Sequence, residues 1–376
     1  MNNIYLYIKQ NFFFKIFITS FPLILLSKII FQRPHKVIGI DLAKRKLHFA
    51  AINLDNKVVL KKAMDRRSFF ENLSTMFPES ETFVFEACGG AHYMAQRLES
   101  IGHKAILLKP KDVKAYAKTR QKNDINDSIA ICKASCDPDL IHVKAKTIEE
   151  QEISYLHKAR QNIIQQRIQY SNSLMTSLFE FGYLVTCGKS TFAKSCQNFV
   201  NFALEEGFIN NTIAEQMLLD CKEIEQLMIR EQSLDKELAA KNRSSKKAKI
   251  LETIPGIGTI NASILSIKPV EAYDSAKDFA ASLGIVPKQN STGGKIILGR
   301  ITKQGDRYAR TMLIQAGRSL LMRSYKTNQT SGALSEFIER LKEKGKSFNV
   351  IAVATANKLA RIAYACLVKN RNYQLV

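Results

Sequence analysis

From Val37 onward the chain alternates short apolar runs with amphipathic segments. The runs KVIGIDL, LHFAAIN and KVVLKKAM predict three consecutive strands, with a turn at Asp55-Asn56 between the second and the third. A helical pattern over Arg67–Met76 follows, then the apolar strand TFVFEA, a helix from about Ala91 to Ser100 and the apolar run HKAILLK. Apolar runs joined by helices are typical of parallel strands that are covered on both faces.

This order of elements, β-β-β-α-β-α-β-α, is that of the ribonuclease H-like fold. We therefore predict an α/β domain of this class over residues 37–146. In that order the first strand is central, and the next parallel strand is its neighbour. The carboxyl ends of these two strands then lie side by side, where α/β sheets form their ligand sites.

The middle of the chain, residues 147–245, is predicted to be helical and coiled-coil-like. Residues 147–182 form one long helix in this prediction, and residues 212–240 form a second with an apolar seam close to a heptad. Periodicity alone leaves two pairings open, a hairpin within one chain and a coiled coil between chains. A basic linker, KNRSSKKAK, leads to a mainly α C-terminal domain over residues 246–376.

The net positive charge of the chain indicates a polyanionic partner. The chain has 56 Lys and Arg against 34 Asp and Glu, a formal net charge of +22. The basic residues are spread along the chain and do not gather in one amphipathic segment, which favours nucleic acid over a membrane surface. Seven cysteines without a CxxC pair argue against zinc and indicate a reduced cytoplasmic compartment.

The first segment, residues 1–36, is apolar and aromatic, a composition that a signal peptide or a membrane span would also have. Lys15, Pro22 and Lys28 interrupt it, and no small-residue cleavage site follows. We therefore interpret it as an extension outside the core, translated from an upstream start, and expect no membrane partner.

Four carboxylates are candidates for a metal site. Asp41 and Glu86 lie at the ends of two predicted neighbouring strands, and Asp124 and Asp127 are three residues apart where a helix begins, so they share one helical face. Clustered carboxylates repel each other unless cations neutralise them. Oxygen ligands suit Mg²⁺ or Mn²⁺, and two such ions about 4 Å apart can hold both oxygens of a phosphodiester displacement.

Each acid also has an ordinary explanation. Asp41 can cap a strand, Glu86 can be a surface residue, and Asp124 with Asp127 can serve as N-cap and first-turn acid. The shared placement of the first two at strand ends favours the metal site.

The C-terminal region contains a helix, a PGIG turn and a second helix over residues 251–266, which has the form of a helix-hairpin-helix element. Gly256 and Gly258 allow a tight turn whose N–H groups can point at a phosphate. PGxG turns also occur for packing alone. The surrounding charge favours binding to a nucleic-acid backbone.

A glycine-rich loop with two hydroxyls follows. Ser291 and Thr292 precede Gly-Gly, and cations surround them: Lys288, Lys295, Arg300, Lys303, Arg307 and Arg310. A hydroxyl among cations is suited to attack or bind a phosphate. An ordinary hairpin loop and a solvated basic face are the alternatives.

Together, the strings GIDLAK, FEACGG, KNDINDSIAI, IPGIGTINA and LGIVPKQNSTGGKIILGRITKQGDRYAR resemble the transposases of the insertion sequence 110/1111 group. The resemblance covers about residues 37–322. It implies a RuvC-like domain whose acids Asp41, Glu86, Asp124 and Asp127 bind metal, and a C-terminal domain whose serine, Ser291, attacks DNA. We choose Ser291 over Thr292 because a primary hydroxyl is less hindered.

The resemblance further implies excision and insertion by strand exchange, a circular intermediate, homo-oligomers and, in characterised relatives, a structured noncoding RNA. Acids and serine lie in separate predicted domains, so we expect the active site to form by docking. Two rival hypotheses remain open here. One is a metal-dependent nuclease or junction resolvase that uses water, and the other is a noncatalytic nucleic-acid-binding relic.

Overall fold

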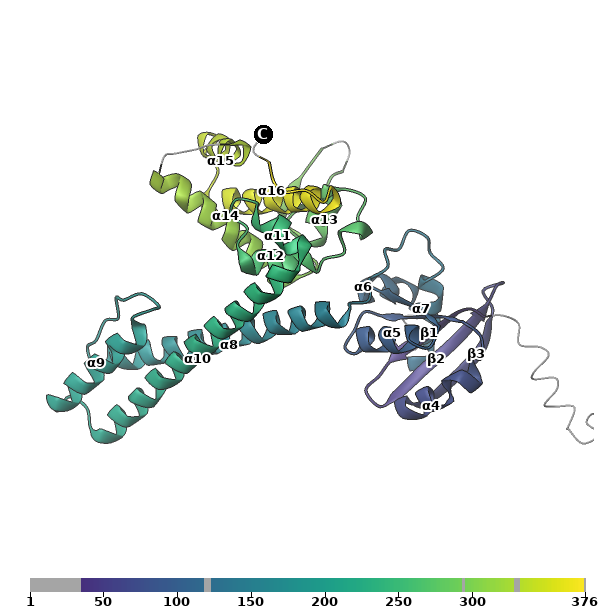
Figure 1. The fold of residues 1–376 in the computed structure, drawn as a ribbon, viewed down its shortest axis with the longest axis horizontal. Helices are drawn as coiled ribbons and strands as arrows, with labels where there is room; N and C mark the ends of the chain where they lie inside the picture. Colours follow the sequence, from purple (N-terminus) through teal and green to yellow (C-terminus); the bar gives the residue numbers. More distant parts are fainter. Residues whose placement is uncertain (1–34, 118–122, 293–294, 328–331, 375–376) are drawn as a thin grey trace, which may run out of the picture. The chain divides into compact units, whose positions relative to one another are not determined.

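The structure is a computed structural model that describes residues 35–117, 123–292, 295–327 and 332–374. The chain divides into two compact units, one up to Thr147 and one from Ile148 (Figure 1). Each unit is described by itself below. The apolar segment 1–36 lies outside the described residues except for its last two positions, where the first strand begins.

Unit 1 is built on a five-stranded mixed sheet of order β3-β2-β1-β4-β5 (Figure 1). Strands β1 (His35–Leu42), β2 (Lys46–Asn53) and β3 (Val58–Asp65) form an antiparallel meander. Strands β4 (Thr82–Glu86) and β5 (Lys104–Leu108) continue the sheet in parallel from β1. The meander and the two helix-linked parallel strands match the predicted order of elements.

Helices cover both faces of this sheet. On one face, α4 (Arg66–Met76) and α5 (Ala91–Glu99) enclose a core that includes Ile38, Phe49 and Phe85. On the other face, α7 (Asp124–Ala134) packs on residues such as Val37 and Val84. A short helix α6 (Pro110–Val113) and a 3-10 turn η1 (Lys114–Tyr116) follow β5. Because side chains alternate along a strand, the sheet has two distinct faces.

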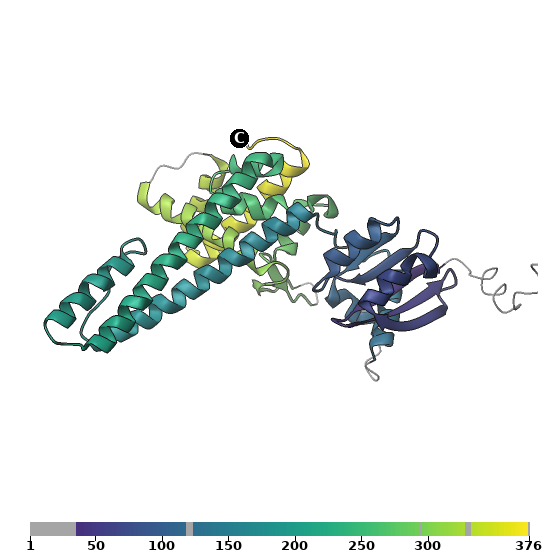
Figure 2. The same cartoon turned by 60° about the horizontal axis from the view of Figure 1, so that its bottom comes forward.

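Unit 2 begins with two long helices, α8 (Ile148–Glu180) and α10 (Asn211–Ser244), which lie side by side in both views (Figures 1 and 2). Ion pairs join them, Lys241 to Glu152 at 2.7 Å and Arg167 to Glu231 at 3.2 Å. The structure thus pairs the two predicted helices as a hairpin within one chain. A helix that the pattern analysis missed, α9 (Phe192–Glu205), packs on the same apolar cluster through Cys196 and Val200.

The rest of unit 2 is mainly helical, with one short β-ribbon. Its elements are α11 (Lys246–Glu252), α12 (Thr259–Ser266), η2 (Val270–Ala272), α13 (Ala276–Ser282), β6 (Pro287–Gln289), β7 (Leu298–Ile301), α14 (Arg307–Thr327), α15 (Ala333–Glu343) and α16 (Phe348–Val368). Among the described helices, α16 is long and apolar enough to span a membrane. Half of that stretch is buried in this unit, where Ile351, Leu359 and Ala363 are core residues.

Candidate functional site

Strand alternation directs three polar side chains to the face of the sheet that α7 covers. Ile38 and Ile40 of β1 join the core under α4 and α5, so Asp41 faces the opposite side. The same parity applies to His48, between the core residues Leu47 and Phe49, and to Glu86, which follows Phe85. All three lie at one edge of the sheet.

Strand register brings these side chains next to each other. In the antiparallel β1–β2 pair, Asp41 lies directly opposite His48. In the parallel β1–β4 pair, Ile40 lies opposite Phe85, so Asp41 and Glu86 are the next residues on neighbouring strands. The predicted side-by-side placement of Asp41 and Glu86 is therefore present.

Helix α7 contributes the other two acids from its first turn. Asn123 caps the helix by accepting a hydrogen bond from the N–H of Ile125 at 3.1 Å. The hydroxyl of Ser128 donates to the carbonyl of His48 at 2.8 Å, and the N–H of Gly39 donates to the sulfur of Cys132 at 3.1 Å. These contacts anchor the helix on β1 and β2, one turn after Asp124 and Asp127.

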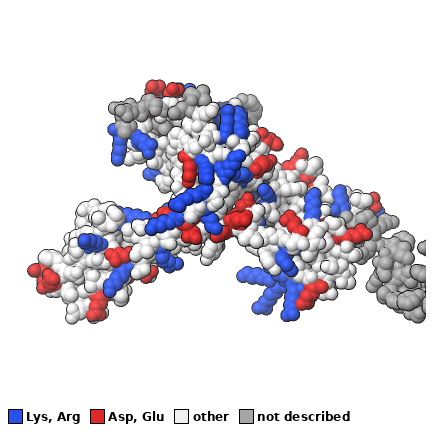
Figure 3. Space-filling view, in the orientation of Figure 1, with Lys and Arg blue, Asp and Glu red and all other residues white. Residues whose placement is uncertain are grey.

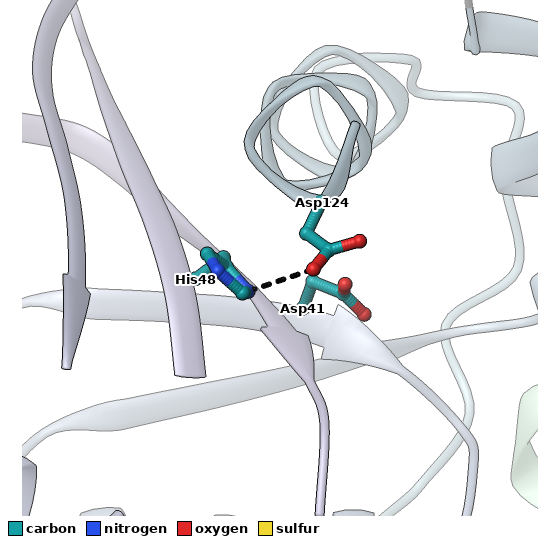
Figure 4. A group of neighbouring side chains, drawn as sticks. All are labelled: Asp41, His48 and Asp124. Atoms are coloured by element: carbon teal, nitrogen blue, oxygen red, sulfur yellow. Dashed lines mark ion pairs between the residues drawn. The ribbon is translucent and has the colours of Figure 1, made fainter. Parts of the chain in front are cut away.

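Three possible ligand atoms meet at this point. One ligand atom each of Asp41, His48 and Asp124 lies within 4.8 Å of the other two (Figure 4). The Nδ1 of His48 lies 3.4 Å from the Oδ2 of Asp124, an ion-pair distance, yet it forms no hydrogen bond. Asp124 comes from the helix and the other two from the strands, so the cluster depends on how α7 docks.

Burial and neighbouring charges change the pKa values of Asp41 and Glu86. Burial raises the pKa of Asp41, and the negative charges of Asp124 and Asp127 raise it further, while His48 lowers it. Burial likewise raises the pKa of Glu86, followed by the charges of Asp41 and Asp127. Because both pKa values are raised, the negative charges of Asp41 and Glu86 are not fully neutralised by the other groups of the protein.

The serine loop lies in unit 2, between β6 and β7. These two strands pair antiparallel, and Thr292 forms an isolated bridge with Lys295. Ser291 is exposed, and its Oγ accepts a hydrogen bond from the side-chain amide of Gln289 at 2.9 Å. The hydroxyl proton of Ser291 is not engaged by this contact.

The basic residues around this loop divide by burial. Lys295, Arg300, Lys303 and Arg307 are exposed and available to a polyanion. Arg310 differs because it is only 8% exposed and donates to the carbonyls of Leu283 at 3.1 Å and Gln304 at 2.8 Å. Its contacts give Arg310 a packing role, while its predicted contact with nucleic acid stays a prediction.

The PGIG turn joins α11 to α12. Gly256 has a φ of +86°, and a Cβ there would lie 2.5 Å from the side chain of Leu320 on α14. Gly258 is the exposed N-cap of α12, with open space around its Cα. Gly256 thus allows the left-handed backbone and the close contact with Leu320, and Gly258 leaves the amino end of α12 accessible.

Two family models match this chain, one over the acid site and one over the serine loop. Residues 38–181 match a family model described as a transposase of the DEDD IS110 type, and residues 248–331 match the transposase IS116/IS110/IS902 family. The transposase for insertion sequence element IS1328 of Yersinia enterocolitica is 34% identical over 87% of this chain and 95% of that protein. The chain belongs to this transposase family.

Further relatives of this transposase extend the picture. The transposase for insertion sequence element IS1111A of Coxiella burnetii is 29% identical over 90% of this chain and 91% of its own length. The pilin gene-inverting protein of Moraxella bovis is 29% identical over 34% of this chain and 38% of its own length. The DEDD type suggests a ribonuclease H-like fold for unit 1, in agreement with its mixed sheet.

The transposase family implies a divalent metal, and the donor set of this chain fits one. Burial, and then the charges of neighbouring carboxylates, raise the pKa values of Asp41 and Glu86, and a bound cation would stabilise the ionised forms of both. The imidazole of His48 is a borderline ligand that suits transition metals such as Mn²⁺ more than Mg²⁺.

His48 is the residue at this site that the motif analysis missed. The signal was present in the strand pattern, because the short turn after Leu42, within LAKRK, pairs Leu42 with Leu47 and so Asp41 with His48. The family motif contains only acids, so a search for carboxylates passes over a histidine on the adjacent strand.

Proposed function

We propose that this chain excises and inserts its insertion sequence by cleaving and exchanging DNA strands at a site that joins the four acids of unit 1 to Ser291 of unit 2. The observation that carries the proposal is the convergence of Asp41, His48 and Asp124 within 4.8 Å at the edge of the sheet. The raised pKa values of Asp41 and Glu86, caused first by burial and then by neighbouring carboxylates, support the same site.

In this proposal the acids bind Mg²⁺ or Mn²⁺. When bound, such ions polarise a phosphate oxygen and neutralise charge on the reacting phosphodiester. Asp41 and Asp124 supply oxygen ligands from a strand and a helix, while Glu86 and Asp127 complete the negative field that attracts the cations. The hydrogen bonds of α7 to β1 and β2 hold these ligands in place.

Ser291 is the proposed nucleophile. Its Oγ attacks phosphorus, the bond from phosphorus to one deoxyribose oxygen breaks, and the departing oxygen takes up a proton. Gln289 donates to the Oγ and does not engage the hydroxyl proton of Ser291, which passes by way of solvent to the departing oxygen. A hydroxyl from a second DNA strand then displaces the serine, which restores the enzyme and joins the strands.

Exposed cations and the PGIG turn supply backbone contacts in the same proposal. Lys295, Arg300, Lys303 and Arg307 surround the loop with Ser291 and Thr292, and positive charge there would stabilise the developing charge on the phosphate. Gly258 exposes the N–H groups that begin α12, a suitable contact for DNA phosphates, with Gly256 shaping the turn.

A covalent protein–DNA adduct tests the proposal. Full-length protein, supercoiled DNA carrying the element ends, Mg²⁺ and the element's own noncoding RNA are incubated, denatured and examined for protein-linked DNA. We expect an adduct with the native chain and with Thr292→Ala, and none with Ser291→Ala. An adduct that survives loss of Ser291 and disappears with Thr292→Ala contradicts the choice of nucleophile.

The same reaction separates the rival functions. A nuclease that uses water leaves nicked DNA with Ser291→Ala and never a covalent adduct. A noncatalytic relic binds DNA and leaves it intact. Omitting the noncoding RNA tests whether an RNA partner is required, and light scattering during chromatography tests the expected homo-oligomer.

A further inference from the structure

Arg66 lies at the acid edge of unit 1, the edge of the sheet that carries Asp41 and Glu86. Its positive charge has no part in the proposed reaction. Arg66 is the first residue of α4, directly after Asp65, the last residue of β3. Asp65 is paired with Lys46 at the start of β2, and β1 ends beside it. The topology therefore places Arg66 at the same edge of the sheet as Asp41 and Glu86.

The guanidinium of Arg66 reaches across this edge toward the metal site. One terminal nitrogen lies 3.5 Å from the carbonyl of Ala43, in the turn after Asp41. The other lies 3.6 Å from the point that a Cβ on Gly90 would occupy, in the loop after Glu86.

Within the part of the chain that the structure describes, the one hydrogen bond of the Arg66 side chain goes to the carbonyl of Ala43, at the long distance of 3.5 Å. Among the described residues, no carboxylate lies within ion-pair distance of its guanidinium, and its buried Nε has no hydrogen-bond partner. Its neighbour Arg67 is the opposite case, with a side chain that is 88% exposed and pairs with Glu71 at 2.7 Å. A partly buried cation without an anion is costly unless a ligand supplies one.

The turn beside Arg66 carries more positive charge. Lys44, Arg45 and Lys46 are consecutive and exposed between β1 and β2. Figure 3 shows blue side chains gathered along the lower edge of the unit that holds the sheet. A strand of phosphates that approaches the acids from this turn would meet cations before it meets the carboxylates.

We propose that Arg66 binds a phosphate of the DNA strand that enters the acid site, with the Lys44–Lys46 turn contacting the neighbouring phosphates. The guanidinium presents parallel N–H donors, which suit a phosphate better than a lone carbonyl does. Arg66 is thus a positioning residue for the scissile strand. The inference rests on the proposed function, because DNA is taken as the substrate.

Salt-dependent DNA binding by the full chain tests this role without any cleavage step. Fluorescently labelled DNA from one end of the element is titrated in Ca²⁺ over a series of salt concentrations. We compare the native chain with Arg66→Gln, which keeps a donor for the Ala43 carbonyl, and with Arg66→Lys, which keeps the charge. The matched control is Arg67→Ala, one residue further on, whose native charge is already paired.

We expect Arg66→Gln to weaken binding about 10-fold and to reduce the slope of log affinity against log salt by about 1, the loss of one phosphate contact. Arg66→Lys retains the slope, and Arg67→Ala matches the native chain within about 2-fold, as a paired surface charge should. Thermal melting of each variant verifies that it is folded.

A native slope and affinity for Arg66→Gln overturn the inference, as does an equal loss for Arg67→Ala. A loss seen with RNA of the same sequence and absent with DNA also overturns it. If Arg66→Gln fails to fold, Arg66→Lys decides through affinity: weaker binding at a retained slope supports a contact between the guanidinium and a phosphate, and native affinity overturns the inference. A native chain that binds no DNA instead contradicts the proposed function.

Discussion

The acid cluster and the serine loop are held in place by different kinds of contact. Asp41, His48 and Glu86 project from paired strands of a five-stranded sheet, and α7 is anchored over them by hydrogen bonds to β1 and β2. Ser291 lies beyond a two-stranded ribbon of exposed residues, with one side-chain hydrogen bond to its Oγ.

This difference matches the chemistry proposed for each region. A metal site needs ligands held within a few tenths of an ångström, which a buried sheet and a docked helix provide. A nucleophile that must reach a phosphate on a large substrate is better placed on an exposed loop that a rigid scaffold supports. Four predictions test whether this contrast holds.

The largest effect is expected from Asp41→Asn. Loss of this carboxylate should reduce strand cleavage by about 1,000-fold or more, because it removes a central ligand of the proposed metal site. Stability without metal should stay equal or rise, since the substitution relieves repulsion from Asp124 and Asp127. Cleavage assays and thermal melting with and without Mn²⁺ measure both quantities.

Mn²⁺ should raise the melting temperature of the native chain and leave that of Asp41→Asn nearly unchanged. Equal stabilisation of both proteins would show that the cation binds elsewhere.

The second effect concerns His157, a buried residue of α8 in unit 2 that contacts α14 and α12. Its ring is 2% exposed, with Nδ1 3.2 Å from the hydroxyl of Tyr308 and Nε2 3.1 Å from that of Ser263. Burial is the main cause that lowers the pKa of His157 to about 4 from its ordinary value of 6.5; the charges of Arg160 and Lys268 lower it further, and Asp306 acts in the opposite direction.

The fold thus favours neutral His157, so its stabilisation is complete above pH 6.5 and is lost as the pH falls from 6.5 toward 4. The expected loss is about 3 kcal/mol, measured by urea unfolding at several pH values. His157→Gln should flatten this part of the pH profile. If the free energy of unfolding of His157→Gln falls between pH 6.5 and pH 4 as much as that of the native chain, His157 is not the cause of the loss.

The third effect compares one glycine from each region. A Cβ on Gly39 would lie 2.4 Å from the carbonyl of Ser128 in α7, whereas a Cβ on Gly299 in β7 would meet nothing closer than 3.8 Å. Gly39→Ala should therefore destabilise the protein by about 1–3 kcal/mol and weaken Mn²⁺ binding, because α7 must shift. Gly299→Ala is the control, with unfolding within about 0.5 kcal/mol of the native chain.

If Gly299→Ala costs as much as Gly39→Ala, the contrast between a tightly packed acid site and an open ribbon is wrong.

The smallest effect separates two arginines near the loop. Arg307→Ala should lower the salt slope of DNA binding by about 1 with little change in stability, because Arg307 is exposed. Arg310→Ala should cost about 1–3 kcal/mol in unfolding and leave the slope unchanged, because Arg310 donates to buried carbonyls. The reverse result would assign DNA contact to Arg310 and packing to Arg307.

Much of the acid site was predictable from local pattern. The apolar strand that ends at Asp41, the strand that ends at Glu86 and the helix that begins at Asp124 are visible in the sequence, and strand order places them together. His48 was missed because its role depends on register in a hairpin, one strand away. Arg310 resembled its exposed neighbours because burial of a long side chain has no local signature.

What the sequence determined by itself was the set of chemical groups and their approximate elements: the acids, Ser291, the cations and the strand and helix pattern that carries them. These follow from side-chain identity and short-range periodicity, which any segment expresses alone. Only the tertiary structure decided that His48 joins the acids, that Gly256 packs on Leu320 and that Arg66, which has no carboxylate partner in the described part of the chain, reaches the turn after Asp41. Such properties arise from contacts between residues distant in the chain, and local pattern does not encode those distances.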